Sequence, residues 1–421
     1  MPIPSNQKPQ IKALLLALSD RPVAHYLCRN LVRFGFDIRA IYPVGSVLNY
    51  TRYLPKGGCL SPFHKWCSII LAAENWFGEP IVLRPIGTLA VRFLKRRLLT
   101  VTMQWLPDVL IPLDERAIRL CRDLLAGRAG CLPTSLEALL KRSLGNPQTL
   151  NQRLSRKGNY EAACEAGIRV PMQVAPAHLG EVRDFARTVG YPIVVKEENT
   201  AGGVGVTVCP DERTLFAAVY QPASKVGAGR LKKLLTMWLQ PSQKALRGIT
   251  LQQFVTGVPT MREVLCWDGR VVAGFSLAKI ESYPASTGAA SVVRAIDNAE
   301  MAEATQRLVA KLGLNGFADV DFIVDEASKA AYCIELNARP TGLTHLGAHF
   351  GGSLELALHR LLADTGAPEL PSSCGNDTVA IFPKEWWRDP QSEALYSAYH
   401  DLPWDDPEVV RYYVSKTPDP F

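Results

Sequence analysis

The chain has 421 residues, of which 47% are hydrophobic and 21% are charged. These proportions are ordinary for a globular protein and exclude a disordered, collagen-like or coiled-coil chain. No apolar run reaches the about 18 residues that a membrane-spanning helix needs, so we expect no membrane partner. The net charge of +7 favours anionic small molecules, and since no nucleic-acid motif accompanies it, we expect no nucleic-acid partner.

The cysteines and the start of the chain bear on the cellular compartment. Ten cysteines occur without a Cys-x-x-Cys pair or a Cys/His spacing suited to zinc. The first residues lack the apolar core of a secretory signal. Both features predict free thiols in a cytoplasmic protein.

Strand and helix patterns alternate in the first third of the chain. Residues 11–18 have the pattern of a buried strand, 23–34 of a helix that stops at Gly35, and 36–42 of a second strand. This β-α-β unit predicts a parallel sheet with a right-handed crossover. The turn after the first strand lacks Gly-x-Gly-x-x-Gly, so the dinucleotide-binding fingerprint is missing. A third strand at 108–112 and a helix at 114–125 continue the pattern.

The pattern changes from about residue 150. A Gly-rich turn separates two predicted strands, Trp267-Asp-Gly-Arg270 predicts a tight hairpin, and an amphipathic helix at 299–312 ends at Gly313. The predicted strands of this region are 191–196, 205–209, 250–255, 262–267, 270–277, 318–324 and 331–336.

The most informative motif is Ile-Glu-Leu-Asn-Ala-Arg-Pro at 334–340. Side chains alternate along a strand, so Glu335, Asn337 and Arg339 should share one face while Ile334 and Leu336 point into the core. An acid, an amide and a guanidinium on one face suit a hard cation and a phosphate, and Asp321 on the neighbouring strand can add a second carboxylate. The alternative is an exposed edge strand with ordinary surface polarity.

Two further segments are weaker signals when taken alone. Lys196 ends a strand and is followed by a Gly-rich turn over Asn199–Val206, whose backbone N–H groups could approach an anion. A Gly-rich hairpin beside a surface lysine explains this segment equally well. Leu251-Gln-Gln-Phe-Val255 enters a Gly turn, where backbone groups could contact an adenine edge.

Together and in this order, these segments resemble the ATP-grasp superfamily of the carboxylate–amine ligase type, over roughly residues 150–365. The resemblance implies an α/β fold in which a Rossmann-like N-terminal domain precedes a two-lobed ATP-grasp fold, with the nucleotide held between two sheets. The implied parts are a Rossmann-like domain at 1–130, a helical connector at 131–150, a small lobe at 151–255, a large lobe at 256–370 and a C-terminal extension at 371–421.

The resemblance also implies ATP with two Mg²⁺ ions, which Mn²⁺ could replace, and a homodimer. It assigns Asp321, Glu335 and Asn337 to the metal and Arg339 to the transferring phosphoryl group. The implied nucleotide-binding residues are Lys157, Lys196, Gly202, Gly203, Val204, Gly205, Gln253, Phe254, Val255 and Glu263.

The hinge departs from the family pattern at two positions. Gln253 stands where Glu is frequent, so the adenine contact there should be mostly through the backbone. Pro259 stands where the ribose-binding acid usually lies, and Glu263, two pleats further on, is the substitute unless it faces solvent.

The resemblance implies an ADP-forming ligase that activates a small-molecule carboxylate as an acylphosphate and couples it to an amine. Two alternatives remain: phosphorylation of another oxygen, such as an enolate or bicarbonate, and a nucleotide-binding module without turnover. The candidate catalytic residues are Arg339, Lys196 and Arg294. Arg294, Arg339 and His345 are the candidate substrate contacts, and His349 is four residues beyond His345. A surface salt bridge for Arg294 and structural roles for the histidines are the alternative interpretations.

Overall fold

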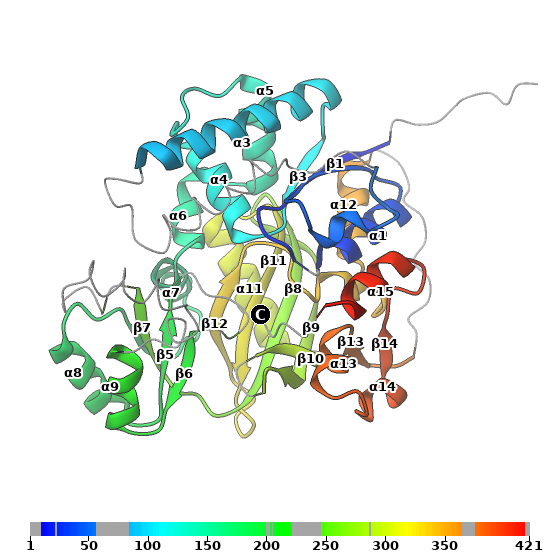
Figure 1. Cartoon of the computed structure of the whole chain (residues 1–421). Helices are drawn as coiled ribbons and strands as arrows, with labels where there is room; N and C mark the ends of the chain where they lie inside the picture. The colour runs from blue at the N-terminus through cyan, green and yellow to red at the C-terminus, as the bar shows by residue number, and fades with distance from the viewer. Residues whose placement is uncertain are drawn as a thin grey trace, which may run out of the picture.

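The computed structural model describes residues 10–21, 23–55, 84–198, 203, 205–220, 246, 248–285, 288–363 and 375–416. In this part of the chain the strands form three sheets, of three, seven and four strands. Helices cover the sheets, which confirms the mixed α/β class (Figure 1). Across the described residues, no helix combines the length and apolar character needed to cross a bilayer.

The N-terminal sheet is parallel and has the predicted β-α-β order. β1 (Lys12–Leu16) lies between β2 (Asp37–Ile41) and β3 (Val109–Pro112). Apolar clusters cover both faces of β1, because its side chains alternate between two cores. The helices of this region are α1 (Val23–Arg33), α3 (Arg84–Trp105), α4 (Glu115–Leu125) and α5 (Thr134–Leu144). The sequence pattern did not predict α3, a long helix that packs on α4 and α5 through the second of these cores.

One carboxylate joins the end of β1 to the start of α4. Asp114 caps α4 by accepting the backbone N–H of Ala117 at 2.9 Å, and it also accepts the N–H of Leu18 at 2.7 Å. The loop after β1 and the first turn of α4 are therefore held side by side at the carboxyl edge of the sheet.

The four-stranded sheet is antiparallel and is covered by two helices on its outer side (Figure 1). An apolar cluster joins the sheet to these helices. The strands in order across the sheet are β4 (Gln173–Val174), β7 (Ile249–Gln253), β5 (Ile193–Glu197) and β6 (Val206–Cys209), and the helices are α8 (Leu179–Val189) and α9 (Glu212–Tyr220).

The seven-stranded sheet occupies the centre of the molecule (Figure 1). α11 (Ala299–Leu312) covers one face through an apolar cluster that includes Val264, Val320 and Phe322. The predicted hairpin is confirmed, with Asp268 at φ 48° and Gly269 at φ 71° between β8 and β9. The strands in order are β12 (Ala331–Asn337), β11 (Gly316–Val324), β8 (Val258–Trp267), β9 (Arg270–Tyr283), β10 (Ala289–Ile296), β13 (Thr378–Ile381) and β14 (Tyr399–Asp401).

The C-terminal segment is built into both the large sheet and the N-terminal core. It supplies β13 and β14, and its last helix packs on the core around β1 through Val409, Tyr412 and Tyr413. The other helices are α6 (Leu150–Arg153), α7 (Arg156–Glu165), α12 (Leu354–Leu362), α13 (Lys384–Arg388), α14 (Ala394–Ser397), α15 (Pro407–Val414) and the 3₁₀ helices Val47–Asn49, Pro147–Thr149 and Thr344–Ala348.

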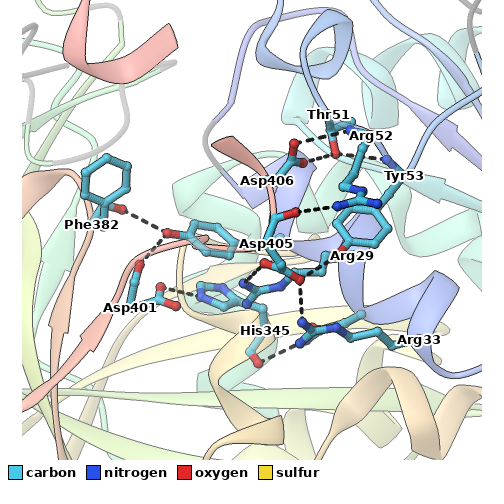
Figure 2. A network of polar contacts seen from close by, with 12 residues as sticks. Arg29, Arg33, Thr51, Arg52, Tyr53, His345, Phe382, Asp401, Asp405 and Asp406 are labelled. Atoms are coloured by element: carbon cyan, nitrogen blue, oxygen red, sulfur yellow. Dashed lines mark hydrogen bonds and ion pairs between the residues drawn. The ribbon is translucent and has the colours of Figure 1, made fainter. Parts of the chain in front are cut away.

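A polar network fastens this segment to α1 (Figure 2). Arg29 and Arg33 of α1 form ion pairs with Asp405, and Thr51 donates a hydrogen bond to Asp406. The network and the shared core fix the start of α13 relative to the carboxyl edge of the N-terminal sheet.

Candidate active site

The register of β11 and β12 brings acidic side chains together on one face of the large sheet. Asp321 lies opposite Glu335, and Asp319 lies opposite Asn337. On its other side Asp319 lies opposite Glu263 of β8. The face away from α11 therefore carries four carboxylates and an amide, because residues directly opposite in a sheet share a face.

A β-bulge in β12 changes the orientation of one residue. Phe322 pairs with Cys333 and Asp321 pairs with Glu335, so Ile334 is the extra residue between them. The prediction that Ile334 points into the core is wrong because the bulge breaks the alternation there. Ile334 instead lines a cavity, while Leu336 is buried in the core as predicted.

Glu263 lies inside the acidic face. Its side chain is fully buried and accepts hydrogen bonds from the hydroxyls of Thr341 and Thr344, the latter at 2.7 Å. The solvent-facing alternative is therefore wrong, and the two threonines occupy the carboxylate that was expected to contact ribose. Burial raises the pKa of Glu263 to about 8.

Asp319 also belongs to the acidic face, although the sequence motif did not point to it. It is buried, and burial together with Asp321 and Glu263 raises its pKa well above the ordinary value. Its position opposite both Asn337 and Glu263 could have been found from strand parity, since Asp319 and Asp321 lie two residues apart on one strand.

The donor set fits a hard divalent cation. Burial and the charge of Glu335 raise the pKa of Asp321 to about 6, and Asp319 Oδ1 is buried without a hydrogen-bond partner among the described residues. Lys279, Lys196 and Arg339 offset only part of the rise in the Asp321 pKa, and carboxylate and amide oxygens are the ligands that Mg²⁺ takes. Asn337 donates its amide N–H to Asp319 and Asp321 at 3.2 Å each, so the amide must turn over to present its oxygen.

The described residues contain no group of three His, Cys, Asp or Glu side chains already arranged around a metal position. Mg²⁺ is commonly held by one or two carboxylates together with water and phosphate oxygens.

A cavity that opens to solvent lies between the small sheet, β12 and α7, with about 380 Å³ of empty space in and around it. Its polar lining includes Lys196 of β5, Arg156 of α7 and Glu335 of β12, and its apolar lining includes Ile334 and Leu336. Arg156 Nη1 lies 2.9 Å from Glu335 Oε1, and Lys196 donates to the carbonyl of Ile334 at 3.4 Å. The cavity thus has cationic side chains that can bind an anion and apolar walls that can pack against a flat ring.

Burial and the neighbouring charges shift the pKa values of the ionisable side chains in the cavity. Burial lowers the pKa of Lys196 to about 8, against the opposing effect of Glu335. Burial alone would raise the pKa of Glu335, but Arg156 and Lys196 outweigh it and hold that pKa below its ordinary value. Glu335 is therefore ionised at neutral pH and available to a cation.

Lys157 lies outside this cavity. Its side chain is 71% exposed and pairs with Glu161 at 3.6 Å on the surface of α7. Consecutive residues of an α-helix point about 100° apart, so only one of Arg156 and Lys157 can face β12. Arg156 is the residue that does so.

Two glycines of the Gly-rich turn lie among the described residues, and the hinge follows β7, whose carboxyl end is opposite to that of the antiparallel strand β5. Gly203 and Gly205 have φ values of 85° and 70°, which favour glycine, whereas Gly202 and Val204 lie outside the described residues. At the hinge, Gln253 donates its backbone N–H to the carbonyl of Met172 at 2.8 Å.

The remaining hinge residues differ in exposure. Phe254 is exposed and Val255 is partly buried, just beyond the end of β7. Gln253 Oε1 accepts the backbone N–H of Met172 at 3.3 Å, so its side chain is occupied within the hinge.

Arg339 contacts the acidic face, whereas the side-chain contacts of Arg294 lie elsewhere. Arg339 donates to Asn337 Oδ1 at 3.2 Å and lies 3.7 Å from Glu115 of α4. Arg294 is exposed on β10, where it donates to Thr378 at 3.3 Å and lies 4.0 Å from Asp377.

The two histidines have structural contacts. His345 is buried, and its Nε2 lies 2.7 Å from Asp401 Oδ2 (Figure 2). Its ring stacks on that of Tyr26 with the ring centroids 4.0 Å apart. His349 Nε2 lies 2.9 Å from the carbonyl of Asn376, and its ring stacks on Tyr399. Both side chains join the C-terminal segment to the rest of the fold.

Comparison with known sequences agrees with this geometry. The family model of the ATP-grasp domain matches residues 158–343. The arginine-specific large chain of carbamoyl phosphate synthase from Halalkalibacterium halodurans is 25% identical over 257 residues, which are 59% of this chain and 23% of that protein. The chain spans at most about a quarter of the length of the curated relatives it matches.

Solved structures share the fold at low sequence identity. The biotin carboxylase domain of 2-oxoglutarate carboxylase from Hydrogenobacter thermophilus has a TM-score of 0.54 at 13% identity, covering 87% of this chain and 72% of that one. The L-amino acid ligase from Bacillus licheniformis has a TM-score of 0.51 at 17% identity, covering 86% and 76%. Residues 158–343 therefore form an ATP-grasp domain, and the two sheets that face a shared cavity agree with that match.

Proposed function

We propose that the protein is an ADP-forming ligase that activates a carboxylate with ATP and couples it to an amine. The observation that carries the proposal is the cavity in which Lys196, Arg156 and Glu335 meet beside the acidic face of β11 and β12. Cations for phosphates and oxygen ligands for a divalent ion lie at one end of a partly apolar space, which suits a nucleotide.

In this proposal the nucleotide lies between the small sheet and β12. Arg156 and Lys196 bind the phosphates, and the turn containing Gly202, Gly203, Val204 and Gly205 covers them. The backbone N–H and the side-chain oxygen of Gln253 are both hydrogen-bonded to Met172. The backbone groups of Phe254 and Val255 are therefore the proposed adenine contacts. Arg156 takes the role that the sequence assigned to Lys157.

Asp321, Glu335 and Asn337 are the proposed ligands for Mg²⁺. We propose that two such ions bind and that Mn²⁺ can replace them. When bound, the ion neutralises phosphate charge and orients the phosphates. Arg156 must share or release Glu335 for that carboxylate to bind an ion, since the two form an ion pair at 2.9 Å.

The chemical difficulty is the approach of two anions, a terminal phosphate and a substrate carboxylate. Arg339 and Lys196 place positive charge next to the acidic face, where it stabilises the charge that develops on the transferred phosphoryl group. The carboxylate oxygen attacks phosphorus and ADP leaves; the amine then attacks the acyl carbon and phosphate leaves.

A screen of carboxylates and amines by ADP release tests this proposal. We expect release that depends on both a carboxylate and an amine, abolished by Glu335→Gln and by Lys196→Ala, with Lys157→Ala as the matched control. Turnover at the wild-type level in both active-site variants would contradict the assignment.

Phosphorylation of bicarbonate is the second candidate. The Hydrogenobacter thermophilus domain was solved with MgADP and bicarbonate, and the curated relatives are carbamoyl phosphate synthases. ADP release that needs bicarbonate and no other carboxylate would select this alternative.

We further propose the five-part division stated for the sequence, a homodimer and a cytoplasmic location. The last is supported by the cysteines, since all seven in the described residues are free thiols. The homodimer is supported by the Hydrogenobacter thermophilus domain, which was solved as a dimer.

A further inference from the structure

Four basic side chains from distant parts of the chain converge where the N-terminal sheet meets the large sheet. Arg21 follows β1, Lys279 lies on β9, Arg339 follows β12 and Lys384 begins α13. The C-terminal segment brings Lys384 to this junction, because β13 pairs with β10 and α13 packs on β9 and β10.

Strand register places Lys279 on the acidic face. Met261 of β8 lies opposite Asp321 on one side and opposite Leu277 of β9 on the other. Lys279 is two residues beyond Leu277 on the same strand, so its side chain projects from the same face as Asp321.

The end of β12 lies next to Lys384. The Lys384 ammonium is 3.7 Å from the point that a Cβ on Gly342 would occupy, and Gly342 is three residues beyond Arg339. Arg339 in turn lies 3.7 Å from Glu115, in the first turn of α4.

Electrostatics link the four cations. Burial, together with the charges of Lys279 and Arg21, lowers the pKa of Lys384 to about 8. Burial and the charge of Arg339 also lower the pKa of Arg21. The positive groups are therefore close enough to repel one another.

In the described part of the chain this cluster has few direct contacts with carboxylates, although Asp321 acts on Lys279, and Asp114 and Glu115 act on Arg21, from further away. Among the described residues Lys384 has no hydrogen-bond or ion-pair partner, Lys279 donates only to the carbonyl of Gly288 at 3.0 Å, and Arg21 donates to the hydroxyl of Ser19 at 3.3 Å. Arg339 alone has a carboxylate within 4 Å. Partly buried cations without counter-ions destabilise a fold, so an anion from outside would relieve the cost.

Resting on the proposed function, we propose that Arg21 and Lys384 bind a second anionic group, a carboxylate or a phosphate, of the acceptor substrate, which is the carboxylate that accepts the phosphoryl group. Lys279 and Arg339 lie between this subsite and the acidic face. The acceptor is then a small acid with a second anionic group, which the C-terminal segment and the loop after β1 select together.

Calorimetric titration of the MgADP-loaded full-length protein with inorganic phosphate and with succinate tests the subsite. We expect Lys384→Met and Arg21→Met to weaken binding of at least one of these anions at least about tenfold, as expected for loss of a desolvated charge. Lys384→Arg should retain most of the affinity, and Lys141→Met, on the surface of α5, is the matched control. Phosphate binding alone identifies a phosphate group, and succinate binding alone identifies a carboxylate.

The two proposals fail in different ways. A wild-type protein that binds MgADP but neither anion, or that binds them no better than the Lys384→Met and Arg21→Met variants do, would overturn the subsite. A wild-type protein that does not bind MgADP would overturn the proposed function. Thermal unfolding of the variants supplies the folding control, because removal of an unpaired cation should not lower the unfolding temperature.

Discussion

Arg156 and Glu335 form an ion pair between α7 and β12, with Nη1 and Oε1 separated by 2.9 Å. The pair joins the cavity between the sheets to the acidic face, because Glu335 lies opposite Asp321. It also holds a side chain that could bind phosphate in contact with one that could bind the divalent ion.

The first prediction concerns which of two adjacent basic residues, Arg156 or Lys157, contacts the phosphates. Arg156→Met should weaken MgATP binding by about tenfold or more, since a buried cation facing phosphates is lost. Lys157→Met is the matched control and should change the affinity less than about twofold, because Lys157 pairs with Glu161 at the surface. Fluorescent-nucleotide titration measures both, and the opposite order of effects would reassign the phosphate contact to Lys157.

The second prediction follows from the Lys196 pKa, which burial lowers to about 8. The ammonium is charged below that pH and neutral above it, so nucleotide affinity should fall as pH rises from 7 to 9. The fall cannot exceed about tenfold for each pH unit above the pKa of the free protein. Lys196→Arg keeps its charge throughout and should flatten the profile, whereas identical slopes for both proteins would exclude Lys196 as the titrating group.

The third prediction concerns stability and Glu263, whose pKa burial raises to about 8. A raised carboxyl pKa means that the folded state binds the proton more tightly than the unfolded chain. This stabilisation is complete below the ordinary pKa of about 4.3 and is lost as pH rises through 8.

Glu263→Gln removes that titration while keeping the shape of the side chain. From pH 5 to pH 8 the unfolding temperature of the wild type should therefore fall relative to that of the variant. Glu303→Gln, on the exposed face of α11, is the control. Parallel curves for the wild type and Glu263→Gln would show that Glu263 is ionised in the fold at all these pH values.

Local sequence rules predict the structure correctly where it depends on residues that are close in sequence. Alternation placed Glu335 and Asn337 on one face, and Asp268-Gly269 formed the predicted hairpin because Asp-Gly accepts positive φ values. The bulge at Ile334 was not predictable in this way, because it depends on how β12 pairs with β11.

Contacts between distant segments account for most of what the sequence left unassigned. The periodicity of α7 gives no reason to choose Arg156 over Lys157 until β12 is beside it. The approach of Lys384 to Arg21 depends on β13 joining the large sheet, and no local pattern around either residue indicates that pairing.

Arg153 is a further buried cation, and its guanidinium contacts carbonyl groups at the ends of helices. Its guanidinium donates to the carbonyls of Asn146 and Leu312 at 2.8 Å each and to those of Gly313 and Leu144. Leu144 ends α5 and Leu312 ends α11, so one side chain joins the N-terminal helices to the large sheet's covering helix. Burial lowers the pKa of Arg153 to about 10, which leaves it charged at neutral pH.

The fourth prediction is that Arg153→Leu lowers the free energy of unfolding by about 3 kcal/mol, because carbonyl groups at both helix ends lose their donor. Arg142→Leu, on the exposed surface of α5, should change it by less than about 0.5 kcal/mol. Urea denaturation followed by circular dichroism measures both values. Equal small losses would mean that water replaces the guanidinium at these carbonyls, and the join between α5 and α11 would then depend on apolar packing alone.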